Sequence, residues 1–157
     1  MKKITGFMCA VAAFSALAGV DLPAKGFSAG KDSNMVIVRG GEWFSKALRL
    51  TAGSESDAVA VFDRRFSVKP AVYEVQAEIR GTGRAFIELH LRHQDGSVTV
   101  KRIAATDATG RYRDLEGRFD MRRFQVKNPL TAVQVVLGVE KGGSVDFDDV
   151  ELEIDND

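Results

Sequence analysis

Residues 73–80 read Tyr73-Glu74-Val75-Gln76-Ala77-Glu78-Ile79-Arg80, with apolar side chains at the odd positions and polar ones at the even positions. Successive side chains of a β-strand point to opposite faces, so this period of two predicts a strand with one dry and one wet face. The run Gly81-Thr82-Gly83 then turns the chain into a second segment of the same period. Its inward side chains are Ile87, Leu89 and Leu91, and its outward ones are Glu88, His90 and Arg92. We expect the two strands to be neighbours.

Further strand signals lie on both sides of this pair, with hardly any helical periodicity between them. They cover residues 35–39, 47–51, 58–62, 66–68, 98–100, 115–121, 133–139 and 144–154. Asp95-Gly96 predicts a hairpin turn, because glycine tolerates the positive φ that such a turn requires. In the last segment the apolar residues change parity between Phe147 and Val150, so we expect a β-bulge near Asp148-Asp149.

These half-wet strands, joined by close turns, predict an all-β fold in residues 34–157: a two-sheet antiparallel β-sandwich. A lipocalin-like closed barrel is the structural alternative. Residues 19–33 are rich in Gly, Ala, Ser and Lys and have no apolar period, so we interpret them as a flexible tether leading into the fold.

The N-terminus has the order of a secretory signal peptide. Met1-Lys2-Lys3 precedes a largely apolar run that ends at Ala16-Leu17-Ala18, so we interpret residues 1–18 as a cleaved leader. An uncleaved anchor or a buried helix is the alternative, although polar interruptions leave the run too short to span a bilayer. We therefore expect an exported protein, periplasmic or extracellular, with no stable membrane anchor after cleavage. Cys9, the single cysteine, lies in this leader, so the mature chain would carry no thiol.

The charge balance argues against nucleic acid as a partner. The chain carries 22 basic and 22 acidic side chains, with no excess of cations to neutralise phosphates.

Three motifs together resemble the galactose-binding-like jelly rolls of carbohydrate-binding modules, of the cellulose- and xylan-binding type. They are the pair of strands around the Lys69-Pro70 turn that leads to Tyr73, the segment from Gly110 to Met121, and the ending Phe147-Asp148-Asp149-Val150-Glu151-Leu152. The resemblance covers roughly residues 35–154 and implies a jelly-roll sandwich that binds carbohydrate.

The same resemblance implies a structural calcium ion held by Asp149, with Asp148 as its neighbour. Calcium takes six to eight oxygen ligands, so backbone carbonyls or Glu42 would have to complete the site. The alternative is that both aspartates only form the bulge and face solvent.

The candidate ligand-binding residues are Trp43, Glu88, His90, Arg92 and Tyr112. Aromatic rings stack on the apolar faces of sugars, which motivates Trp43 and Tyr112; the alternative for both, and the more common role of such residues, is packing against the core. The outward side chains Glu88, His90 and Arg92 offer hydrogen bonds, and arginine forks pair with carboxylates and sulfates, which favours an acidic glycan. The alternative is a solvated face with cross-strand ion pairs.

We find no catalytic machinery in the sequence and expect no enzyme. The nucleophile-elbow, P-loop and dinucleotide-binding motifs are absent. The favoured function is non-catalytic recognition of a polysaccharide or glycan, and the competing one is a structural or protein-interaction sandwich that docks an envelope protein.

Overall fold

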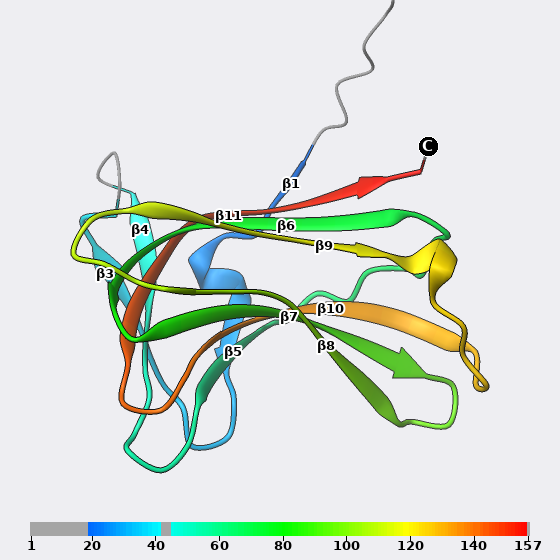
Figure 1. Ribbon diagram of the computed structural model, residues 1–157, viewed down its shortest axis with the longest axis horizontal. Helices are drawn as coiled ribbons and strands as arrows, with labels where there is room; N and C mark the ends of the chain where they lie inside the picture. The colour runs from blue at the N-terminus through cyan, green and yellow to red at the C-terminus, as the bar shows by residue number, and fades with distance from the viewer. Residues whose placement is uncertain (1–18, 42–44, 157) are drawn as a thin grey trace, which may run out of the picture.

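The computed structural model describes residues 19–41 and 45–156 and shows a sandwich of two antiparallel sheets (Figure 1). Its strands are β1 Val20–Asp21, β2 Phe27–Ala29, β3 Asn34–Arg39, β4 Lys46–Thr51, β5 Ala58–Phe62, β6 Val72–Thr82, β7 Arg84–His93, β8 Val98–Asp107, β9 Arg113–Asp120, β10 Leu130–Val139 and β11 Ser144–Asp155. The described residues also form the short 3-10 helices η1 Ala24–Gly26 and η3 Met121–Arg123. The all-β sandwich is confirmed, and the closed barrel is wrong.

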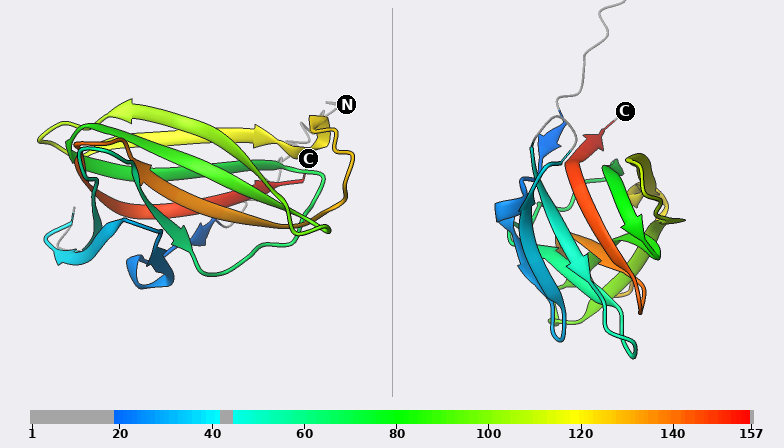
Figure 2. Two further views of the ribbon diagram at one scale, coloured as in Figure 1. Left: turned by 90° about the horizontal axis from the view of Figure 1, so that it is seen from below. Right: turned by 90° about the vertical axis from the view of Figure 1, so that its left-hand side faces the viewer.

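The first sheet has the strand order β3-β4-β11-β6-β9, and β1 also pairs with β11. The second sheet has the order β2-β5-β10-β7-β8. Figure 2 shows these two layers from further directions, with β8, β7, β10 and β5 side by side in the view from below.

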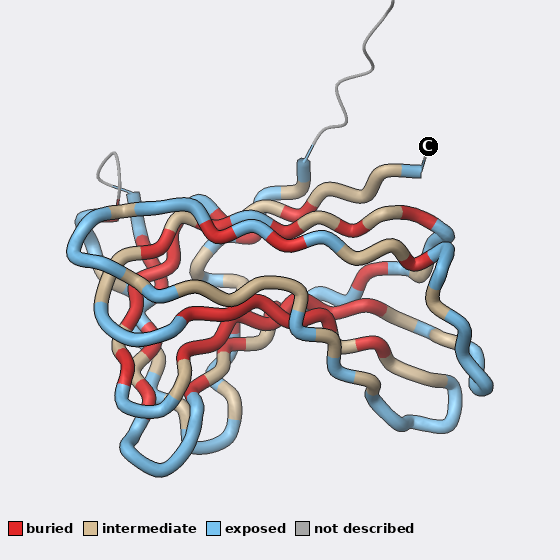
Figure 3. Tube along the Cα trace, in the orientation of Figure 1, coloured by how far each residue is buried: buried red, intermediate tan, exposed pale blue. Residues whose placement is uncertain are grey.

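The core lies between the sheets and is built from the predicted period of two. In β6 the side chains of Tyr73, Val75 and Ile79 are fully buried, and in β7 so are those of Leu89 and Leu91. Buried positions accordingly alternate with more exposed ones along β6, whereas β7 and β10 contain runs of consecutive buried residues (Figure 3). Each such row turns the polar side chains of its strand to the outer face of its sheet.

The expectation that the strands of residues 73–80 and 87–91 are neighbours is wrong. β6 pairs with β11 and β9, whereas β7 pairs with β10 and β8 in the other sheet. The chain crosses between the sheets at Gly81 and Gly83, whose φ angles are 145° and 93°, values that favour glycine. The polar faces of the two strands therefore lie on opposite sides of the molecule. Both strands have one apolar face, and the alternating pattern does not say which sheet that face belongs to.

The expected β-bulge and hairpin are both confirmed. Asp148 pairs with Glu78 and Glu151 with Gln76, so the register of β11 shifts between them. Asp149, within the bulge, has a φ of 48°. β7 and β8 pair antiparallel around the Asp95-Gly96 turn.

The expectation of a tether over residues 19–33 is wrong for residues 20–29. β1 pairs with β11, β2 pairs with β5, and the side chains of Leu22 and Phe27 are buried in the core. Strands of two and three residues are too short to show a period. The expected signal peptide, residues 1–18, lies outside the described residues. Among the residues that are described, no helix is long and apolar enough to cross a membrane.

Candidate functional site

The outer face of the second sheet gathers the polar residues of β7. Ile87, Leu89 and Leu91 point into the core, so the alternation of the strand puts Glu88 and His90 on the outer face. Arg92 follows two residues later on the same face. This side of the sheet is bordered by loops, because the 52–57 loop and the β7–β8 turn both project from it in Figure 1.

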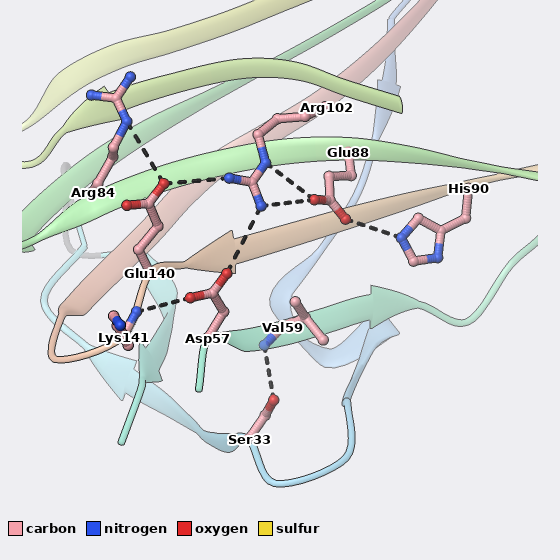
Figure 4. Close-up of polar contacts among 9 residues, drawn as sticks. All are labelled: Ser33, Asp57, Val59, Arg84, Glu88, His90, Arg102, Glu140 and Lys141. Carbon is pink, nitrogen blue, oxygen red and sulfur yellow. Dashed lines mark hydrogen bonds and ion pairs between the residues drawn. The ribbon is translucent and has the colours of Figure 1, made fainter. Parts of the chain in front are cut away.

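Glu88 is the centre of a hydrogen-bonded cluster on this face (Figure 4). Its side chain is only 11% exposed, and Arg102 of β8 donates from Nε and Nη2 to its Oε1 at 3.2 and 3.0 Å. The His90 Nε2 lies 3.1 Å from its Oε2. A register shift between β7 and β8 places Arg102 directly opposite Glu88.

The carboxyl of Glu88 stays ionised at neutral pH. The hydrogen bond with His90 lowers its pKa most, burial opposes this shift, and Arg102 adds to the lowering. A buried carboxylate held in this way accepts hydrogen bonds, and near pH 7 it carries no proton that it could donate as a general acid.

Arg102 forms a flat, fixed surface over an aromatic ring. Its guanidinium carbon lies 3.7 Å from the centroid of the Phe86 ring, which is almost fully buried. Its edge also reaches Glu140 Oε1 at 3.3 Å from Nη1, and Asp57 Oδ2 at 3.9 Å from Nη2. Hydrogen bonds hold the edge of the guanidinium, and one of its faces lies against the ring. The Arg102 side chain is still 40% exposed. Guanidinium planes stack well on other flat groups, because their faces are weakly hydrated.

Arg92 is anchored by the neighbouring strand β10. Its Nε and Nη2 both donate to Gln134 Oε1, at 3.1 and 3.0 Å. The Gln134 Nε2 donates in turn to the Phe62 carbonyl oxygen at 2.8 Å. Gln134 is 5% exposed, so these consecutive hydrogen bonds fix the Arg92 side chain to a buried group of the sheet.

Three residues of this cluster and its surroundings were not predicted from the sequence: Phe86, Arg102 and Gln134. Phe86 has the parity of Glu88 and His90, so an aromatic residue on the wet face of the strand was a readable signal. Arg102 had none, because the register shift that brings it to Glu88 depends on the pairing of two strands.

The other predicted ligand residues do not join this cluster. Tyr112 lies at the first sheet, where the guanidinium carbon of Arg80 is 4.6 Å from its ring centroid. Trp43 lies outside the described residues, and so does Glu42, one expected calcium ligand.

The two predicted metal residues face different partners. The carboxylate of Asp148 accepts hydrogen bonds from the Ser45 hydroxyl and the Asp149 backbone N–H. Asp149 instead has carboxylate oxygens within 4.8 Å of those of Asp21 and Glu151. β1, which was expected to be part of a tether, supplies Asp21.

No protein-family model and no curated protein matches the sequence. Among solved structures, the chain is similar to the CBM22-1 xylan-binding domain from Paenibacillus barcinonensis Xyn10C: the TM-score is 0.67 and the identity 13%, over 91% of this chain and 99% of that one. It is similar to the family 11 carbohydrate-binding module of a cellulosomal cellulase of Clostridium thermocellum, with a TM-score of 0.57 and 11% identity over 89% and 96% of the two chains. It is also similar to a Stig cyclase from Fischerella sp., with a TM-score of 0.60 and 13% identity over 88% and 98%. The chain thus has the jelly-roll fold of carbohydrate-binding modules, as the sequence resemblance implied.

Proposed function

We propose that this chain, folded as a carbohydrate-binding module, is a non-catalytic protein that binds a glycan on the outer face of its second sheet. The observation that carries the proposal is the guanidinium of Arg102, which lies over Phe86 beside the anchored polar side chains of Glu88, His90 and Arg92. A stacking surface flanked by fixed donors and acceptors is what a sugar ring and its hydroxyls require. The neighbours whose printed names concern carbohydrate binding support the same function.

The polar groups of this face are oriented before any ligand arrives. Arg92 and Arg102 are each held by two hydrogen bonds to a neighbouring strand, so binding orders few additional side chains. From Phe86 to Arg92 the strand rises about 20 Å, which gives room for a chain of several sugar units along it.

Retention on immobilised polysaccharides tests the proposal. We expect the protein to be retarded by xylan, cellulose or an acidic polysaccharide, and the Arg92→Ala and His90→Ala variants to bind about tenfold more weakly, since each removes polar contacts to the ligand. Arg118→Ala is the matched control, because Arg118 is an exposed arginine on the first sheet. Absence of retention on every polysaccharide, or equal weakening by the control, would contradict the proposal.

On the proposed glycan face the buried carboxylate is Glu88, and its ionised state argues against catalysis there. Glycoside hydrolysis requires a carboxylic acid with a raised pKa, and the pKa of Glu88 is lowered instead. We expect no new reducing ends when the purified protein is incubated with the polysaccharide that it binds. Cleavage abolished by Glu88→Gln would overturn this part.

Export is supported by the sequence of residues 1–18 alone. We expect the protein recovered from periplasm or medium to begin at Gly19, as measured by intact mass. A full-length mass in the cytosolic fraction would contradict export.

A structural calcium ion would be held by Asp21, Asp149 and Glu151, whose carboxylate oxygens lie within 4.8 Å of one another. Three carboxylates that converge from β1 and β11 fit the oxygen chemistry of calcium and would join the two strands when an ion is bound. We expect millimolar calcium to raise the melting temperature of the protein but not that of an Asp149→Ala variant. If calcium leaves the melting temperature of the native protein unchanged, the proposal of a calcium site is wrong.

Docking of an envelope protein is the second candidate, and one observation favours it. β3 is an edge strand of the first sheet, and Val36 and Ile37 within it are both 48% exposed. Exposed β-branched edges pair readily with another strand. Cross-linking of a Val36→Cys variant in envelope preparations tests the docking of a partner on β3. If no cross-linked product forms, this second candidate function is wrong.

A further inference from the structure

A hollow lies on the opposite side of the molecule from the Glu88 cluster, on the outer face of the first sheet. It has a volume of about 440 Å³, and its lining includes Arg49, Arg80, Thr82, Gly110, Ser144 and Asp146. These residues come from β4, β11 and β6, which are adjacent strands, and from the loop before β9. It shares none of these residues with the Glu88 cluster.

Strand register arranges the hollow as two rows. Asp146 of β11 is the partner of Arg49 on one side and of Arg80 on the other. Two residues earlier, Ser144 is the partner of Thr51 and of Thr82. The first row therefore carries charges and the second row carries hydroxyls. The two rows are separated by about 6.6 Å along the strands, which is two residues of β-strand.

The charged row has an excess of one positive charge. Asp146 is only 4% exposed, and Arg49 donates to its two oxygens from Nε at 2.6 Å and from Nη2 at 3.0 Å. Arg80 donates to Oδ2 from Nη2 at 3.3 Å. The side chains of Arg49 and Arg80 are 45% and 37% exposed. A guanidinium has five N–H donors, so one shared carboxylate leaves donors on both arginines for a ligand.

Thr51 and Tyr112 lie beside the residues that line the hollow, Thr51 against Ser144 and Tyr112 against Arg80. The Thr51 and Ser144 hydroxyl oxygens lie 2.9 Å apart, and each hydroxyl both donates and accepts. The Tyr112 ring lies against the Arg80 guanidinium and limits its movement. Its hydroxyl is the one buried side-chain polar atom without a hydrogen-bond partner among the described residues. The hollow thus presents arginine donors at one end and hydroxyls at the other.

We propose that this hollow binds a sugar acid, with the ligand carboxylate on Arg49 and Arg80 and its hydroxyls on the Thr51-Ser144-Thr82 row. Arginine forks match the planar geometry of a carboxylate. Asp146 neutralises one of the two arginines, so the three side chains keep a net charge of plus one, which attracts an anion. The row of hydroxyls lies about 6.6 Å from the charged row, a distance that a sugar ring can span. It therefore favours a hydroxylated acid such as a sugar acid over a carboxylic acid without hydroxyls, such as acetate.

Amide chemical-shift titration of the full chain with D-glucuronate tests the proposal, with D-glucose, acetate and phosphate as comparison ligands. We expect glucuronate to shift the amides of Thr82, Gly110 and Ser144, and to bind at least tenfold more tightly than the other three. The amides of His90 and Arg92 should stay in place. Glucose, acetate or phosphate binding as tightly as glucuronate would overturn the proposal.

Substitutions of opposite sign separate binding from folding. Arg49→Gln and Arg80→Gln should weaken glucuronate binding about tenfold, and Arg118→Gln, an arginine elsewhere on the same sheet face, should leave it unchanged. Asp146→Asn removes the competing carboxylate and should strengthen binding even while it lowers stability. Weaker binding in Asp146→Asn, or equal weakening by Arg118→Gln, would contradict the proposal. Retention on polysaccharide should be unaltered in these variants, so this site and the glycan site fail independently.

Discussion

Replacement of Arg102 by alanine tests the Glu88 cluster on β7 and β8, at one edge of the second sheet. The substitution removes two hydrogen bonds to Glu88, at 3.2 and 3.0 Å, and the contact with the Phe86 ring at 3.7 Å. It also removes the exposed hydrogen bond to Glu140 at 3.3 Å, which contributes less than about 0.5 kcal/mol. Hydrogen bonds to a buried carboxylate contribute about 1.5 to 3 kcal/mol, and the 40% exposure of Arg102 reduces this to about 1.5 kcal/mol. The ring contact adds about 0.5 kcal/mol. We therefore expect a loss of about 2 kcal/mol at pH 7.

Chemical denaturation and thermal melting measure this loss. A decrease of about 2 kcal/mol corresponds to a melting temperature lower by about 6 °C in a chain of this size. Arg84→Ala is the matched control, because Arg84 lies on the same strand pair with ion-pair distances of 3.4 and 3.8 Å. Exposed pairs of this kind contribute less than about 0.5 kcal/mol.

The pH dependence gives the sign of the effect. The pKa of Glu88 is lowered in the folded protein, so its ionised form stabilises the fold above the ordinary glutamate pKa. This stabilisation is lost as the pH falls below about 4.3 and through the lower folded value. The difference between the native protein and Arg102→Ala should therefore shrink toward the ring contribution in acid. A stability loss in Arg102→Ala that is no larger at pH 7 than the loss in Arg84→Ala would refute this reasoning. So would a loss that does not change with pH.

Two further substitutions test contacts of buried aromatic side chains, Phe86 in one case and Tyr73 in the other. Gly138→Ala should lower stability by about 1 to 3 kcal/mol, because the new Cβ would lie 2.1 Å from the buried Phe86 ring; Gly53→Ala, with nothing within 4 Å, is its control in urea unfolding. Equal midpoints for the two variants would contradict the close contact. Tyr73→Phe should cost about 1 to 2 kcal/mol, because the Lys69 N–H loses its acceptor, the hydroxyl of the buried Tyr73, at 2.9 Å; an unchanged denaturation midpoint would mean that water replaces the hydroxyl.

Much of the local structure could be predicted from the chain. The inward rows of β6 and β7, the bulge in β11 and the hairpin at Asp95-Gly96 all follow from rules that reach only a few residues along a strand. The same rules placed Glu88 and His90 on a wet face. They failed for β1 and β2, where two or three residues carry no period.

The period of two in the sequence by itself determined which side chains enter the core, because alternation is a property of each strand alone. Only the tertiary structure decided which strands are neighbours. It separated β6 from β7 into different sheets, and it placed Asp146 between Arg49 and Arg80, which are 97 and 66 residues away in sequence. The physical reason is that sheet pairing depends on which apolar faces can be buried together across long loops. Both candidate sites are products of that pairing, since each is assembled from strands that are distant in the chain.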